Sequence, residues 1–537
     1  MMTAVNFVWA ALLLCCSGND AVLLRNRDIP VQANRSDAPE PNGPWKKLRI
    51  ANIFHDGMIL SATCPGSRLW GYGEPGAHII IDLRVDVYDT RVNGNGKWET
   101  YLCVDSPGGP LDIEVIQQIK RKHAGHAMVR GVYFGEVYLC AGEGNMAFPV
   151  KHMRNGTAEL LASSDFPFMR IMTIYPSTSP VPLTEPHILQ NWTKVTPDTL
   201  RYFSAICWTT MRRVYARLNH KRKPDEQIPI GLIGAYYDNT TIRTWTPPEA
   251  IKQCNNKRNM SVEPGKDSAV FNGMIAPLTK FRLSGVLWYQ GESDAATNPE
   301  VYGCRFKALI NAWQGRYPWA EGLPFGIVQL GTQSTEKIPG GTALVRWQQT
   351  AHYGQLPNKA LPRVFMASAF DLDDPGSPFG SRYTRHKEEI AERLFAGIMS
   401  QIYYIHLPFQ GPFPKQIQTD SDQIIIEYDT NVIYRKDHPK ECFQVCCHSP
   451  TIQLSSWHEC KVWHNVTTNW IRSEPNKVFV GSATCGKHAG FVRYAWQLGN
   501  LKCKVYISDY LWSSYGLPGA PFVLPTNWTQ GEEATVY

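Results

Sequence analysis

The pattern of hydrophobic and polar positions changes character twice along the chain of 537 residues. Between residues 48 and 133, apolar residues alternate with polar ones, most clearly where every second residue from Ile81 to Val87 is apolar. This period places the apolar set on one face of a sheet. Two Asn-Gly pairs at 93–96 then favour a hairpin turn. We therefore expect a small N-terminal β-sandwich over residues 48–133.

Between residues 134 and 401 the apolar positions gather into short runs bounded by glycine, at 137–140, 228–233, 285–289, 326–330 and 364–367. Such runs are typical of strands buried on both faces of a parallel sheet. Helical stretches lie between them, at 200–218, 304–313 and 385–396. This alternation predicts a three-layer α/β domain over 134–401, with its ligand site at the carboxyl ends of the strands.

The two ends of the chain differ from this middle part. Residues 402–537 return to short β-like segments rich in cysteine, which predicts a C-terminal β unit, packed alone or with the N-terminal one. Residues 5–16 are apolar and precede Ser17 and Gly18, which predicts a signal peptide at 1–18 and a flexible lead-in at 19–47. No later stretch is long and apolar enough to predict a membrane anchor.

Cysteine and asparagine usage supports export. Of 14 cysteines, Cys15 and Cys16 lie in the predicted signal peptide, and the even remainder predicts disulfides of undetermined pairing. No zinc-type spacing occurs, so we expect no metal. Sequons predict N-glycosylation at Asn34, Asn155, Asn191, Asn239, Asn259, Asn465 and Asn527. We expect a secreted or lysosomal glycoprotein. The net charge of +7 forms no basic block, which argues against a nucleic-acid partner.

Several motifs resemble those of the sialate O-acetylesterase family. The segment 135–146 (GEVYLCAGEGNM) is similar to its G-D-V-W-L-C-x-G-Q-S-N-M, and 288–294 (WYQGESD) is similar to its W-Y-Q-G-E-S-N. Further matches follow in family order at 56–60, 70–73, 322–330, 346–351, 377–381 and 491–496. The resemblance covers about residues 48–522. It implies an SGNH-hydrolase-like fold flanked by β segments, a carboxylic ester hydrolase without a cofactor, and O-acetylated sialic acid or another glycan as partner.

The same resemblance implies a nucleophilic serine, a histidine base and an oxyanion loop. Gly144 stands at the nucleophile position, and Tyr383 replaces the histidine of the family's G-S-I-H-P-R-D-K. Asp238 and Asn239 replace two glycines of the loop, and a glycan on Asn239 would fill the mouth of the site. The retained pair Gln290 and Glu292 is expected to hold the pocket floor or bind sugar hydroxyls.

The sequence leaves three functions open, so whether the chain is an enzyme stays undecided. The first is a catalytically impaired pseudoenzyme that binds glycans. The second is an active carbohydrate esterase with a relocated nucleophile, for which the candidate groups are His386 as base and Ser293, Ser377 or Ser381, with Asp371, Asp373 or Asp374 as orienting acid. The third is a structural extracellular glycoprotein. Cys140, near Gly144, is interpreted as structural.

Overall fold

The computed structural model describes residues 47–531, except for 65, 105, 258–266, 318–321, 334–335, 421, 437–441, 449–453, 472, 482–484, 486–487, 497–502 and 509–515. The predicted signal peptide, all of the lead-in before residue 47, and the sequons at Asn34 and Asn259 lie outside these residues.

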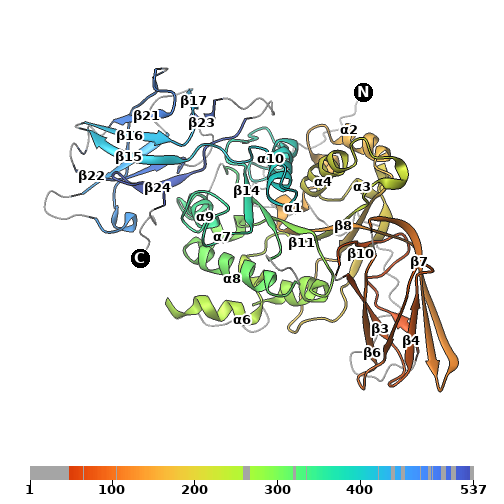
Figure 1. Ribbon diagram of the computed structural model, residues 1–537. Helices are drawn as coiled ribbons and strands as arrows, with labels where there is room; N and C mark the ends of the chain where they lie inside the picture. Colours follow the sequence, from red (N-terminus) through yellow and green to blue (C-terminus); the bar gives the residue numbers. More distant parts are fainter. Residues whose placement is uncertain are drawn as a thin grey trace, which may run out of the picture.

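Two sheets form the N-terminal unit (Figure 1). One sheet contains β1 (Arg49–Ile50), β3 (Ser67–Tyr72) and β6 (Lys97–Leu102). The other is built from β4 (His78–Asp82), β5 (Val87–Arg91), β7 (Gly108–Ile119) and the first part of β8 (Lys122–Gly142), with β2 (Ile59–Ser61) paired to β8.

Two details of the sequence-based expectation are wrong here. The alternation from Ile81 to Val87 is not one strand, because the chain turns at 83–86 and Val85 and Val87 are exposed. Asp82 accepts a hydrogen bond from the Arg84 backbone, which has a left-handed φ of 64°, and so stabilises a turn that apolar periodicity cannot reveal. The Asn-Gly turn at 93–96 does form, but it joins β5 and β6, which belong to different sheets.

The central sheet has the order β10-β9-β11-β8-β12-β13-β14. All neighbouring strands are parallel except β10 and β9. Every residue is buried in β9, β11, β12, β13 and β14, as expected for strands covered on both faces. The bounds are β9 Met169–Ile174, β10 Ile188–Lys194, β11 Ile230–Tyr236, β12 Gly285–Tyr289, β13 Phe325–Gln329 and β14 Val364–Ser368.

Helices cover both faces of this sheet. Figure 1 shows α4 (Ala205–Leu218) and α10 (Lys387–Gln401) on one side, and α8 (Tyr302–Gln314) and α9 (Gly341–Gln349) on the other. The shorter helices are α1 Gly144–Ala147, α2 Gly156–Leu161, α3 Pro197–Leu200, α5 Ile242–Trp245, α6 Pro248–Ile251 and α7 Glu292–Ala295. The result is the predicted α/β arrangement.

One strand joins the N-terminal unit to the α/β unit. The first part of β8 pairs antiparallel with β7, and its last residues pair in parallel with β11 and β12. The boundary expected at 133/134 therefore falls inside a continuous strand. The boundary expected at 401/402 coincides with the end of α10.

The C-terminal unit contains two four-stranded sheets and a two-stranded one. It has its own hydrophobic core, which includes Leu344 and Trp347 of α9. It therefore packs against the α/β unit, and Figure 1 shows it at the opposite end of the molecule from the N-terminal unit. Its strands are β15 Pro414–Asp420, β16 Gln423–Tyr428, β17 Val432–Lys436, β18 Phe443–Cys447, β19 His464–Asn465, β20 Thr468–Asn469, β21 Lys477–Gly481, β22 Ala489–Tyr494, β23 Cys503–Ile507 and β24 Phe522–Pro525.

Disulfides confirm the prediction from the even cysteine number. Cys140 is bonded to Cys207 and so ties β8 to α4, which agrees with its structural interpretation. Cys442 is disulfide-bonded as well. The other pairs are Cys64–Cys103, Cys254–Cys304, Cys446–Cys460 and Cys447–Cys485.

No three His, Cys, Asp or Glu side chains in these parts of the chain are placed to hold a metal ion. None of the helices described above is long and apolar enough to cross a bilayer.

Candidate active site

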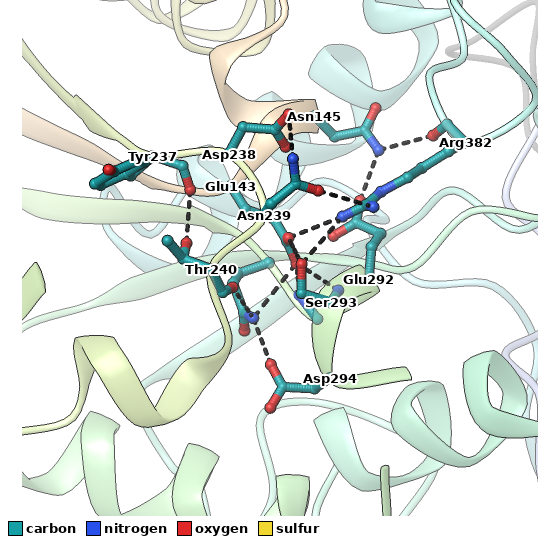
Figure 2. Close-up of polar contacts among 12 residues, drawn as sticks. Glu143, Asn145, Tyr237, Asp238, Asn239, Thr240, Glu292, Ser293, Asp294 and Arg382 are labelled. Carbon is teal, nitrogen blue, oxygen red and sulfur yellow. Dashed lines mark hydrogen bonds and ion pairs between the residues drawn. The ribbon is translucent and has the colours of Figure 1, made fainter. Parts of the chain in front are cut away.

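The site lies at the carboxyl end of β8, where the strand order reverses. Within the sheet, β9 and β11 lie on one side of β8. The chain then crosses over to form β12 on the other side of β8. Ligands of open α/β sheets bind at such a switch point. Four segments meet there (Figure 2): the start of α1 after β8, the loop that follows β11, the loop that leads from β12 into α7, and the loop before α10 that carries Arg382.

Gly144 is buried, and the space where a side chain would stand is already filled. A Cβ atom on Gly144 would lie 2.2 Å from Asp238 Oδ1, and 2.7 Å and 2.8 Å from Cε1 and Oη of Tyr383. Tyr383 Oη donates to the Asp238 carboxylate, 3.2 Å from each oxygen. Gly144, Asp238 and Tyr383, three of the positions that depart from the family motifs, therefore share one small volume.

Neither Tyr383 nor Asp238 supplies the chemistry expected at its position. Burial raises the pKa of the Tyr383 phenol further above its usual value, so the phenol stays protonated and cannot accept a proton from a nucleophile. Burial also raises the pKa of Asp238, while the nearby Arg382 guanidinium opposes this shift. When ionised, Asp238 places negative charge beside residue 144, where an oxyanion would have to form.

A buried ion pair beside Gly144 was missed by the sequence analysis. The Glu143 side chain is fully buried, and Arg382 Nη2 lies 2.9 Å from its Oε2. Glu143 also accepts hydrogen bonds from the backbone of Gly291 (2.9 Å) and Ser293 (3.0 Å), and from Ser293 Oγ (2.5 Å) (Figure 2). The family motifs quoted above have glutamine and isoleucine at these two positions. A glutamate and an arginine replace these two uncharged residues. This joint change was the signal from which the ion pair could have been predicted.

The retained residues Gln290 and Glu292 are buried and bound to protein groups. Gln290 Nε2 donates to Asp294 Oδ2 at 2.6 Å and to the Thr240 carbonyl at 3.1 Å. Glu292 Oε1 accepts a hydrogen bond from Asn145 Nδ2 at 2.6 Å. We call the buried groups around these two side chains the floor of the site, and the expectation that Gln290 and Glu292 hold a pocket there or bind sugar hydroxyls stays a prediction.

Burial shifts the pKa values of several groups in this floor. It raises the pKa of Asp294 to about 7 and lowers the pKa of Lys387 to about 7. It also raises the pKa of Glu143, with a further contribution from the negative charge of Glu292. Lys387 Nζ donates to Asn145 Oδ1 at 2.6 Å, which links α10 to α1. The floor is thus a buried, mixed-charge network.

Two of the three candidate nucleophiles, Ser293 and Ser377, are hydrogen-bonded to groups other than His386. His386 immediately precedes α10, and its Nδ1 lies 2.7 Å from Glu389 Oε1 on that helix. Ser293 bonds Glu143, and Ser377 Oγ donates to the Tyr383 carbonyl at 2.8 Å. In the described part of the chain, neither hydroxyl is hydrogen-bonded to His386. Ser381 lies half-buried in the loop before Arg382.

The candidate orienting acids are paired with basic side chains. Asp371 contacts Arg393 at 2.7 Å, and Asp374 contacts Arg385 at 2.7 Å. Asp373 lies 3.7 Å from Lys504. In the described part of the chain, these acids bind basic side chains rather than the ring of Tyr383 or His386, so they tie structural segments together.

The sequon asparagines in the described residues, Asn155, Asn191, Asn239, Asn465 and Asn527, are all exposed. Asn239 stands at the mouth of the site with a left-handed φ of 56°. Its Nδ2 donates to Asp238 Oδ2 at 3.3 Å, and its Oδ1 accepts from Arg382 Nη1 at 3.5 Å. Glycosylation at these positions stays a prediction.

Two family models match the chain. One is described as carbohydrate esterase, sialic acid-specific acetylesterase, and matches residues 135–380. The other, the sialate O-acetylesterase C-terminal domain, matches residues 415–526. Together they cover the segments of the site around Gly144, Asp238 and Glu292 and most of the C-terminal β unit, whereas Arg382 and Tyr383 lie between the two matched ranges.

Relatives and a solved structure agree with these matches. The chain is 31% identical to the sialate O-acetylesterase of Homo sapiens over 505 residues, which is 89% of this chain and 92% of the relative. It is 30% identical to that of Rattus norvegicus over 534 residues, covering 88% and 94%. A carbohydrate acetylesterase from Xanthomonas citri shares the fold, with a TM-score of 0.72, 22% identity, and coverage of 89% and 99%. The predicted SGNH-like fold class is confirmed, and the chain belongs to the sialate O-acetylesterase family.

Proposed function

We propose that this chain is a catalytically impaired member of its family that enters the secretory pathway and binds O-acetylated sialic acid, or another glycan, without hydrolysing it. The observation that carries the proposal is the contact among Gly144, Asp238 and Tyr383. No nucleophile stands at the end of β8, and the space for one is occupied.

Ester hydrolysis by the serine route needs a nucleophile, a base and oxyanion donors. When only the nucleophile is lost, hydrolases retain about 10³–10⁴-fold catalysis over water through the oxyanion hole and substrate binding. Here the Asp238 carboxylate stands beside residue 144, the nucleophile position that the family resemblance implies, so it would lie close to a developing oxyanion. Because a negative charge there opposes the developing charge, we expect that residual catalysis to be lost as well.

The choice of ligand follows from the family. Its curated relatives are named sialate O-acetylesterases, so O-acetylated sialic acid is the first ligand to test. Secretion or lysosomal delivery is supported by the disulfides, which persist in oxidising compartments.

The test compares the purified, secreted protein with an active family relative on 4-nitrophenyl acetate and on 9-O-acetylated sialic acid. We expect no turnover above that of the relative's own serine-to-alanine variant, together with saturable binding on a glycan array. Turnover near that of the active relative would refute impairment. Absence of any saturable glycan binding would instead favour a structural glycoprotein.

A second candidate, ester hydrolysis through Ser293, is favoured by one observation. The Ser293 hydroxyl lies 2.5 Å from the Glu143 carboxylate, whose pKa is raised by burial. A fluorophosphonate probe would then label the protein, and Ser293→Ala would abolish the labelling. Failure of the probe to label the wild-type chain excludes this candidate.

A further inference from the structure

A cavity of about 150 Å³ lies where the segment after α9 meets the C-terminal β unit. Residues from both units line it, including Tyr353 from the first and Phe413 and Trp528 from the second. A cavity of this size accommodates a six-membered ring such as benzene. None of the side chains described around Gly144 lines it, so it is a separate site.

The walls combine aromatic rings with uncharged polar groups. Phe413 and Trp528 pack edge to face, with ring centroids 5.9 Å apart. The exposed Gln530 adds an amide at the rim. None of the described residues that line the cavity carries a formal charge at neutral pH. Aromatic surface together with a few neutral donors and acceptors suits the apolar face and the hydroxyls of an uncharged sugar.

His352 supplies the most directional polar group of the lining. Its imidazole makes no hydrogen bond to another described residue, although the side chain is half-buried. Burial lowers its pKa to about 4, so the ring is neutral and offers one donor and one acceptor. A ligand hydroxyl can use both.

The backbone around His352 is held in an unusual conformation. Ala351 and His352 both have left-handed φ values, 50° and 67°. Ala351 ends α9 in a helix-terminating turn, in which His352 N donates to the Trp347 carbonyl at 3.2 Å and Ala351 N donates to the Gln348 carbonyl at 3.0 Å. That turn explains the left-handed φ of Ala351 but not the left-handed φ of His352. Such residues cluster at ligand-binding sites.

We propose that this cavity binds one neutral hexopyranose unit of a glycan at its rim, with the His352 imidazole hydrogen-bonded to its hydroxyls and the half-buried Tyr353 ring against its apolar face, above the buried Phe413 and Trp528. The site is additional to the one at Gly144 and does not depend on the function proposed above. It would give the protein a second, uncharged point of contact with a glycan.

Saturation-transfer NMR titration of the full secreted chain with methyl galactoside, methyl glucoside and N-acetylneuraminic acid tests this inference. We expect saturable binding of at least one neutral glycoside. His352→Phe keeps a planar aromatic ring and removes both nitrogens, so it should weaken this binding at least about fivefold, the effect of one lost hydrogen bond. Gln530→Ala, on the exposed rim, gives a second readout if His352→Phe fails to fold. Asp238→Asn reports on the Gly144 site, and Asp225→Asn, at an exposed position outside both sites, is the control that should leave the binding unchanged.

Three results would overturn the proposal. The first is no saturable binding of either neutral glycoside at 20 mM or below, roughly the weakest range that such a titration resolves. The second is binding that Asp238→Asn weakens and the variants at His352 and Gln530 do not, which would place the sugar in the Gly144 site. The third is a preference for the anionic sugar that the His352 variant abolishes, which would exclude a neutral ligand class.

Discussion

Replacing Gly144 by serine should destabilise the protein without restoring esterase activity. The new Cβ would stand 2.2 Å from Asp238 Oδ1 and 2.7 Å from a ring carbon of Tyr383, far inside ordinary contact distances. The Asp238–Tyr383 pair must therefore separate from residue 144. Overpacking of this kind costs about 1–3 kcal/mol. Loss of the Tyr383–Asp238 hydrogen bond adds about 1 kcal/mol, so we expect a loss of roughly 2–4 kcal/mol in unfolding free energy.

Thermal unfolding and chemical denaturation measure this loss, and we expect Tm to fall by roughly 5–10 °C. Gly94→Ser is the matched control, because a Cβ on this exposed glycine meets nothing within 4 Å. It should change the stability by less than about 0.5 kcal/mol. In the background of Asp238→Gly and Tyr383→His, the Gly144→Ser change should cost less than about 1 kcal/mol, which gives a coupling energy of about 1–3 kcal/mol.

Two results would refute this reasoning. An unchanged Tm for Gly144→Ser would show that Asp238 and Tyr383 do not fill the space beside residue 144. Hydrolysis of 9-O-acetylated sialic acid by the single variant, at a rate near that of an active relative, would show that the loss of serine alone silenced the site.

Three further predictions concern the buried network and the disulfides. Arg382→Ile leaves Glu143 buried without its ion-pair partner, so it should cost about 3–5 kcal/mol at neutral pH, and the double variant with Glu143→Gln should recover most of this in denaturation experiments. Because the folded-state pKa of Asp294 is raised to about 7, its contribution to stability is complete at pH values below its unfolded pKa near 4 and is lost as pH rises through 7. Asp294→Asn should therefore flatten the decline in unfolding free energy between pH 4 and 8, by as much as roughly 4 kcal/mol, and an unchanged pH profile would contradict this. Serine at both Cys140 and Cys207 opens a loop of sequence separation 67 and should lower stability by about 4 kcal/mol; a loss below about 1 kcal/mol would contradict a structural role.

The sequence by itself determined five strands of the central sheet and the helices α4, α8 and α10, but it did not predict β9, β10 or α9. The glycine-bounded apolar runs correspond to the ends or the whole of β8, β11, β12, β13 and β14, because strands buried on both faces need continuous apolar sequence. The sequence also determined the family, because the motifs of that family occur along this chain in the same order. The sequence did not reveal the turn at 83–86, because the alternation of apolar and polar residues continues through this tight hairpin without a break.

Only the tertiary structure decided how the altered positions of the site relate to each other. Gly144, Asp238 and Tyr383 are far apart in sequence and were three separate departures, yet they fill one volume. Glu143 and Arg382 are likewise 239 residues apart. Only the structure shows that the two charged residues, which replace uncharged residues of the family motifs, form an ion pair with each other. The physical reason is that local sequence sets backbone conformation, whereas steric exclusion and ion pairing at the end of a strand depend on which loops meet there. The order of the strands in the sheet decides which loops meet.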